Sequence, residues 1–142
     1  MAITYRSNLE GVNWDALRKD LIEDDFHNGR TSHQLKLSFE NSAHQVLARD
    51  KSRVIATARL LSDGVGNAYI VDVWTQKNYQ RQGIASRLIK MLIEAVPGQH
   101  IYLQTDEDAL PFYKQLGFKE QPRGLSLISG NYLDNRTRDN SK

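Results

Sequence analysis

The sequence contains no cysteine among its 142 residues. This absence excludes disulfide bonds and thiolate metal ligands, and it leaves no thiol to carry a covalent acyl intermediate. The four histidines, His27, His33, His44 and His100, do not have the spacing of metal ligands. We therefore expect a protein without a metal site.

Long apolar runs and a strong charge of one sign are missing as well. No stretch approaches the ~20 apolar residues that span a bilayer, and the N-terminus lacks the pattern of a signal peptide. The formal net charge is +2 and the basic residues are scattered, which argues against a surface for nucleic acid. We expect an intracellular, cytoplasmic protein with neither membrane nor nucleic acid as a partner, either a monomer or a homodimer.

The composition is otherwise ordinary for a globular protein, with 39% hydrophobic and 25% charged residues. A chain of this length suits one domain with a real core. We predict a single domain over residues 1–130. The polar tail 131–142 has almost nothing to bury and is expected to be disordered.

One stretch combines an apolar strand, a polar turn and the start of a helix. The apolar run 68–75 precedes the turn, and residues 83–95 have helical periodicity. The first turn of a helix has unpaired N–H groups and a partial positive charge, and Gly83 allows a phosphate to approach the backbone. The stretch therefore predicts a phosphate site, although an ordinary strand-to-helix turn has the same pattern.

The remaining pattern predicts a mixed α/β fold. A strand, a helix and a strand in this order imply a parallel crossover around the helix at 83–95. Asn13 is the expected cap of the first helix. The predicted strands cover 2–6, 43–49, 54–61, 68–75, 101–105, 118–120 and 125–129, and the predicted helices cover 14–23, 31–39, 83–95 and 108–116.

Two motifs resemble those of the Gcn5-related N-acetyltransferase (GNAT) superfamily. Gln80-Arg81-Gln82-Gly83-Ile84-Ala85 is similar to the family's pyrophosphate signature, Gln/Arg-x-x-Gly-x-Gly/Ala. Residues 109–118, with the sequence ALPFYKQLGF, are similar to the family's Ala-x-x-Phe-Tyr-x-x-Leu-Gly-Phe. The two motifs occur in the family's order, and the resemblance covers residues 53–118.

The resemblance implies a mostly antiparallel sheet with a V-shaped splay, flanked by about four helices. It also implies acetyl-CoA as co-substrate and no metal. Asp106 stands where the family often has asparagine, and an anionic residue there would weaken a cofactor contact. The cofactor-binding residues implied by the resemblance are Val73, Trp74, Thr75, Gln80, Arg81, Gln82, Gly83, Ile84, Ala85, Ser86, Asp106 and Tyr113.

Two residues are candidates for the chemistry. Tyr113 matches the family tyrosine that points at the thioester sulfur, and it is the expected acid for the CoA thiolate. Asp72 is the only carboxylate inside the strand at 68–75, and burial would raise its pKa and suit a base that acts through water. Tyr69 aligns with the position of the family's commoner catalytic glutamate. The alternatives are a structural carboxylate for Asp72 and a core aromatic for Tyr113.

The resemblance therefore predicts an acetyl-CoA-dependent N-acetyltransferase that acts on a primary amine of a small molecule, peptide or protein. Because an alkyl amine has a pKa of about 10.4, it must lose a proton before it attacks the thioester in a ternary complex. The alternatives are a non-catalytic acyl-CoA-binding or sensing module of the same fold, and an interaction protein that binds no cofactor.

Overall fold

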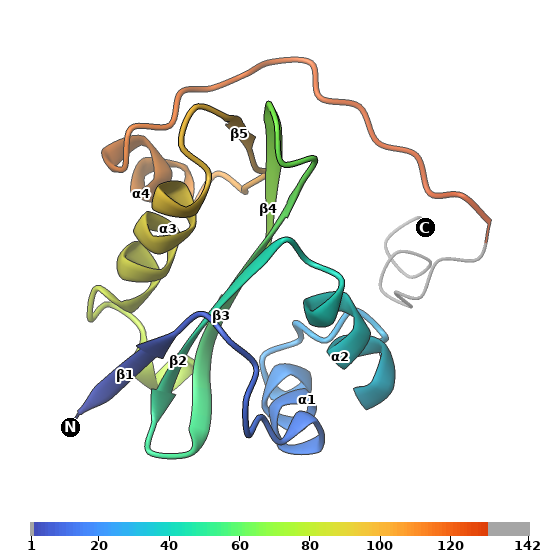
Figure 1. Ribbon diagram of the computed structural model, residues 1–142, viewed down its shortest axis with the longest axis vertical. Coiled ribbons are helices and arrows are strands. Elements are labelled where there is room, and N and C mark those ends of the chain that lie inside the picture. Colours follow the sequence, from blue (N-terminus) through green and yellow to red (C-terminus); the bar gives the residue numbers. More distant parts are fainter. Residues whose placement is uncertain (1, 131–142) are drawn as a thin grey trace.

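The computed structural model describes residues 2–130, which form one five-stranded sheet in the order β1-β2-β3-β4-β5 (Figure 1). The first four strands are antiparallel to their neighbours, whereas β5 is parallel to β4. The predicted mixed, mostly antiparallel sheet is therefore confirmed. The strands are β1 (Ile3–Arg6), β2 (His44–Asp50), β3 (Arg53–Ser62), β4 (Asn67–Thr75) and β5 (His100–Tyr102).

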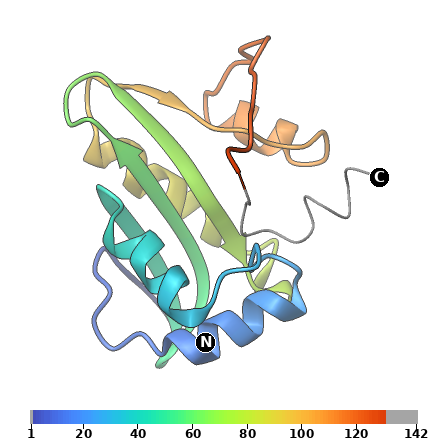
Figure 2. The ribbon, with the colours of Figure 1, turned by 90° about the vertical axis from the view of Figure 1, so that its right-hand side faces the viewer.

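Helices cover both faces of the sheet (Figures 1 and 2). One face carries α3 (Ile84–Ala95), and the opposite face carries α1 (Trp14–Glu23) and α2 (Ser32–Glu40). The helix α4 (Leu110–Gln115) lies beyond β5, and a 3-10 turn, η1 (Lys77–Tyr79), follows β4.

The first two helices begin where side chains satisfy their free N–H groups. The Asn13 side chain accepts a hydrogen bond from the Ala16 N–H at 3.0 Å, as expected. Thr31 and Gln34 form a reciprocal capping box at the start of α2.

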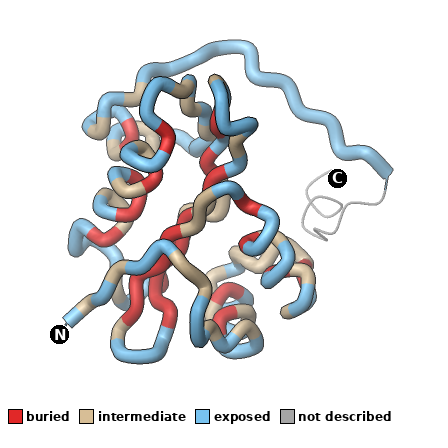
Figure 3. The backbone as a smooth tube through the Cα atoms, in the orientation of Figure 1, coloured by how far each residue is buried: buried red, intermediate tan, exposed pale blue. Residues whose placement is uncertain are grey.

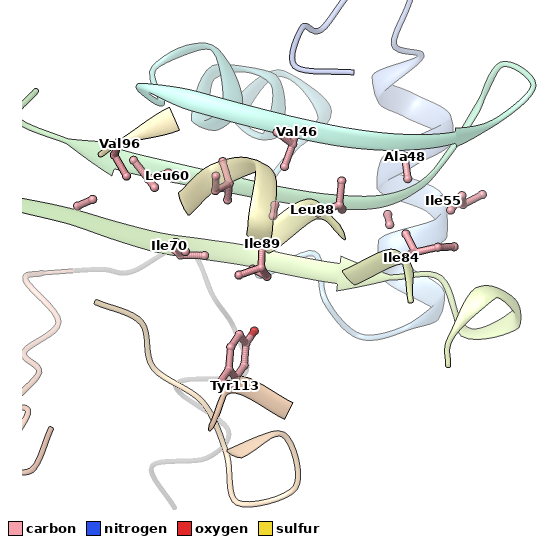
Figure 4. Close-up of a cluster of buried hydrophobic side chains, with 14 residues drawn as sticks. Val46, Ala48, Ile55, Leu60, Ile70, Ile84, Leu88, Ile89, Val96 and Tyr113 are labelled. Carbon is pink, nitrogen blue, oxygen red and sulfur yellow. The ribbon is translucent and has the colours of Figure 1, made fainter. Parts of the chain in front are cut away.

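The sheet separates two hydrophobic clusters. One lies between α3 and the sheet and includes Ile84, Leu88 and Leu92 of α3 (Figure 4). The other lies under α1 and α2 and includes Leu21 and Leu35. The buried segments run along the sheet and the inner faces of these helices (Figure 3). Because a hydrophobic cluster lies on each face of the sheet, each side chain of β4 points toward one cluster or the other.

The prediction of two strands at 118–120 and 125–129 is wrong, because residues 118–130 contain no strand. Leu125 and Leu127 are 94% and 91% exposed, and the segment runs over the top of the molecule in Figure 1. A strand needs a neighbouring strand to pair with, and none of the five strands pairs with residues 118–130. The predicted tail 131–142 lies outside the described residues. No helix within residues 2–130 has the length and apolar character needed to cross a membrane.

Candidate active site

The site begins where β4 and β5 separate. β5 pairs only with Asn67–Tyr69 and ends at Tyr102, so on that edge no strand from residues 2–130 lies beside the second half of β4. This is the V-shaped splay that the family resemblance implies. The Gln76 N–H donates to the Ile55 carbonyl of β3 at 2.8 Å, and therefore the preceding Thr75 carbonyl points to the open edge.

A β-bulge lies in β4 beside this opening. The register between β3 and β4 shifts between Thr57 and Arg59, and Asp72 has φ 54°. A positive φ is uncommon for a residue other than glycine. The bulge bends the strand and changes which face the following residues occupy.

The glycine turn forms the opposite wall. Gly83 has φ 81° and is the first residue before α3, and among the described residues no side chain caps this helix. A Cβ built on Gly83 would meet no heavy atom within 4 Å, so the space in front of the turn is open. The N–H groups of Ile84, Ala85 and Ser86 belong to the first helical turn and have no partner within the helix. The turn therefore fits an anionic group.

These walls enclose a cavity of about 570 Å³ that α4 completes. It brings together most of the predicted cofactor-binding residues, from both motifs and from β4. Three further lining residues were not predicted: Tyr79, and Ala109 and Phe112 of the second motif. The predicted residues that line the cavity are Val73, Thr75, Gln80, Arg81, Gly83, Ile84, Ala85, Ser86 and Tyr113.

Three predicted cofactor-binding residues do not line this cavity. Trp74 is 4% exposed on the opposite face, where its indole N–H donates to the Asp24 carboxylate at 2.9 Å. Gln82 is exposed in the turn. The Asp106 carboxylate accepts a hydrogen bond from the Ala109 N–H at 2.9 Å, which ties it to the start of α4.

Tyr113 combines a packed ring with a place in the cavity wall. Its ring makes edge contacts with Phe112 at 4.9 Å and Phe118 at 5.9 Å between centroids. Burial, with a smaller contribution from the charge of Asp106, raises the pKa of the Tyr113 hydroxyl. The phenol therefore stays protonated at neutral pH, as an acid must.

Asp72 is a buried ion-pair partner. Its side chain is 7% exposed, and it accepts hydrogen bonds from Arg30 at 2.8 and 3.1 Å and from Arg59 at 2.5 Å. Burial alone would raise the pKa of Asp72, but the two guanidinium groups outweigh it and the pKa is lowered. The expected rise is therefore wrong. A carboxylate held by two arginines is a weak base at neutral pH, which favours the structural alternative.

The sequence motifs could not predict this ion cluster, because Arg30 is 42 residues away from Asp72 and belongs to the loop between α1 and α2. Tyr69, at the family's glutamate position, is 37% exposed and lies beside Tyr102 of β5. Within residues 2–130 no group of three or more histidine, aspartate or glutamate side chains is placed to hold a metal ion.

The splayed sheet, with the start of α3 at its opening, defines an α/β protein whose cavity fits an anionic group. The sequence pattern of the acetyltransferase (GNAT) family matches residues 13–118. The chain therefore belongs to the GNAT acetyltransferase family, in agreement with the two motifs.

Known proteins support this assignment. The chain is 32% identical to the soybean (Glycine max) protein "Histone acetyltransferase TAP1" over 113 residues, which are 78% of this chain and 44% of that protein. The chain thus spans less than half the length of this curated relative. A GNAT family protein from Streptococcus pneumoniae is 25% identical with a TM-score of 0.76, over 92% of this chain and 100% of that one.

A further solved structure shares the fold. It is a predicted acetyltransferase from Clostridium acetobutylicum, described with acetyl-CoA. Its TM-score is 0.68 at 20% identity, over 89% of this chain and 96% of that chain.

Proposed function

We propose that this protein transfers the acetyl group of acetyl-CoA to a primary amine. The observation that carries the proposal is the cavity itself, in which the open edge of β4, the uncapped start of α3 and Tyr113 face one another. The Clostridium protein of the same fold, described with acetyl-CoA, supports this choice of acetyl donor.

The chain offers a partner for each part of this donor. The pyrophosphate is expected on the N–H groups of Ile84, Ala85 and Ser86, with Arg81 as a charged neighbour. The pantetheine amides are expected to pair with the backbone of Val73 and Thr75. The Thr75 carbonyl already accepts a hydrogen bond from the Gln80 side chain at 3.2 Å, and a carbonyl oxygen can accept a second one.

The transfer needs no covalent enzyme intermediate. The amine nitrogen, once it has lost its proton to solvent, attacks the thioester carbonyl, so a C–N bond forms and the C–S bond then breaks. A backbone N–H at the open edge of β4 stabilises the oxyanion. After the attack the nitrogen carries an extra proton, which it gives to solvent, while Tyr113 gives its proton to the leaving CoA thiolate and is then reprotonated from solvent.

The second candidate is a module of the same fold that binds acyl-CoA without turnover. The position of Tyr113 in the wall of the cavity favours the enzyme, because a binding module needs no acid there. The decisive experiment follows the release of free CoA from acetyl-CoA with a panel of alkyl amines and arylalkyl amines and with a lysine-containing peptide. Mass spectrometry should identify the N-acetyl product in an amount equal to the CoA released.

Calorimetry on the same preparation separates the outcomes. Binding of acetyl-CoA without release of CoA by any amine would support the non-catalytic module. Absence of binding would overturn both candidates and the assignment of the cavity.

A further inference from the structure

The second half of β4 presents alternate residues to two different partners. Val73 and Thr75 line the cavity described above. Asp72 and Trp74 face the other way, toward the loop between α1 and α2. That loop contacts both of them, since Asp24 accepts a hydrogen bond from the Trp74 indole and Arg30 pairs with Asp72. The loop therefore holds the strand from the side opposite to the cavity.

The conformation of Asp72 determines which face of β4 the following residues occupy. It sits at the bulge with φ 54°, a conformation that is unfavourable for a residue with a Cβ. Arg30 and Arg59 bind both carboxylate oxygens, and the Thr57 hydroxyl donates to the Asp72 carbonyl at 2.9 Å. The side chain and the backbone of Asp72 are therefore both held in place.

The cluster is itself fixed to the loop. Arg30 is 5% exposed, and its Nε donates to the His27 carbonyl at 3.0 Å. The Arg18 Nε of α1 donates to the Arg30 carbonyl at 2.6 Å. The His27 carbonyl therefore holds the Arg30 guanidinium, and Arg18 holds the Arg30 backbone.

We propose that Arg30 and Arg59 are positioning residues for acetyl-CoA, which act by holding the bulge at Asp72. This inference rests on the proposed function. A bulge adds one residue to a strand, and a shift of one residue moves every following side chain to the other face. If Asp72 relaxed to an extended conformation, Val73 and Thr75 would turn away from the cavity and their backbone groups would turn toward β3.

Two variants that both lack the charges of Arg30, Arg59 and Asp72 test whether the conformation of the bulge controls CoA binding. Substitution of Asp72 alone would leave Arg30 and Arg59 without their carboxylate partner, so Asp72→Gly or Asp72→Ala is combined with Arg30→Met and Arg59→Met. Glycine adopts a positive φ readily, whereas alanine does not. We expect the alanine variant to bind CoA about tenfold more weakly than the glycine variant, a difference of about 1.4 kcal/mol in binding free energy.

Two controls separate this effect from general loss of stability. Leu35→Ala destabilises the cluster under α1 and α2 and removes none of the hydrogen bonds of Asp72 given above, so it should bind CoA with the wild-type Kd. Hydrogen exchange of the amides in residues 72–75, measured without ligand, reports on the bulge directly. It should be faster in the alanine variant than in the glycine variant.

The inference is overturned if the alanine variant keeps either the wild-type exchange of residues 72–75 or the wild-type Kd for CoA. Failure of the wild-type protein to bind CoA would count against the proposed function instead. In that case the exchange measurement still decides whether the ion cluster holds the bulge.

Discussion

At the scale of single residues, Tyr113 has both a packing role and a place in the cavity. Its ring contacts Phe112 and Phe118, and its side chain lines the cavity beside the glycine turn. Substitution by phenylalanine separates the two roles, since it keeps the ring and removes only the hydroxyl. The pKa of the hydroxyl is raised, so it is protonated throughout the neutral range.

We expect Tyr113→Phe to fold normally and to bind acetyl-CoA with nearly the wild-type Kd. Positioned acids contribute ~10²–10⁴-fold to rate, so kcat and kcat/KM should fall together by at least ~10²-fold. Steady-state kinetics measures the loss of turnover, calorimetry measures the Kd for acetyl-CoA, and thermal unfolding shows whether the variant is folded. A variant with wild-type kcat would show that Tyr113 serves packing alone.

Asp72 makes stability depend on pH. The two guanidinium groups keep its pKa in the folded protein below the value of about 3.9 for an unfolded chain. Folding therefore favours the charged carboxylate. This stabilisation is complete above the unfolded pKa and is lost as the pH falls through the folded pKa.

We expect the free energy of unfolding of the wild-type protein to fall more steeply below about pH 4 than that of the Arg30→Met, Arg59→Met, Asp72→Gly variant. Urea unfolding of both proteins at a series of pH values gives the comparison. Parallel pH profiles would mean that Asp72 titrates alike in the folded and unfolded states.

At the scale of elements, the glycine turn owes its geometry to one residue. Gly83 has φ 81°, and the space where a side chain would begin is open. Alanine at this position meets no obstacle but carries the cost of a positive φ, about 1–2 kcal/mol. Glutamate adds bulk and a negative charge at the start of α3, where a phosphate is expected.

We therefore expect Gly83→Ala to lower the free energy of unfolding by about 1–2 kcal/mol and to bind acetyl-CoA with a moderately raised Kd. Gly83→Glu should abolish binding by steric block and charge repulsion. Calorimetry on the two variants provides the test, with alanine as the control for backbone strain. Binding of acetyl-CoA to the glutamate variant with unchanged affinity would show that the phosphate does not bind at this turn.

The turn and the ion cluster also show how far sequence could predict the site. The strand, the glycine and the amphipathic helix follow one another within 28 residues, from Ala68 to Ala95, so local periodicity was sufficient to find them. Arg30 meets Asp72 only because the α1–α2 loop folds over β4. No local pattern records such a contact, and burial without its partners gave the wrong direction for the pKa.

At the scale of the whole molecule, the end of the described chain lies apart from the sheet. Leu125 and Leu127 were predicted to be in a strand, yet they are almost fully exposed. Two apolar residues separated by one polar residue satisfy the strand pattern, but pairing with β5 depends on contacts that the pattern does not contain.

We expect the double variant Leu125→Ser, Leu127→Ser to keep the free energy of unfolding within about 0.5 kcal/mol of wild type, since exposed substitutions have small effects. Burial of each leucine in a strand would instead contribute about 1.5–3 kcal/mol. Urea unfolding distinguishes the two cases. A loss of several kcal/mol would mean that this segment packs against the domain in solution.

Whether both substrates bind before the transfer is also a question about the whole molecule, because it depends on whether any residue can carry the acetyl group. No cysteine is present to accept an acetyl group, and the cavity places the open edge of β4 and Tyr113 around the expected position of the thioester. We therefore expect the amine to attack the donor directly while both substrates are bound.

Initial rates measured against acetyl-CoA at several fixed amine concentrations should therefore give intersecting lines in double-reciprocal plots. The enzyme incubated with acetyl-CoA alone should keep its unmodified mass, and Gly83→Glu provides the control for chemical acetylation of surface lysines. Parallel lines together with a trapped acetyl-enzyme would require a nucleophile other than cysteine. Such a result would move the acetyl group through the protein and leave Tyr113 to protonate the thiolate in the first half-reaction only.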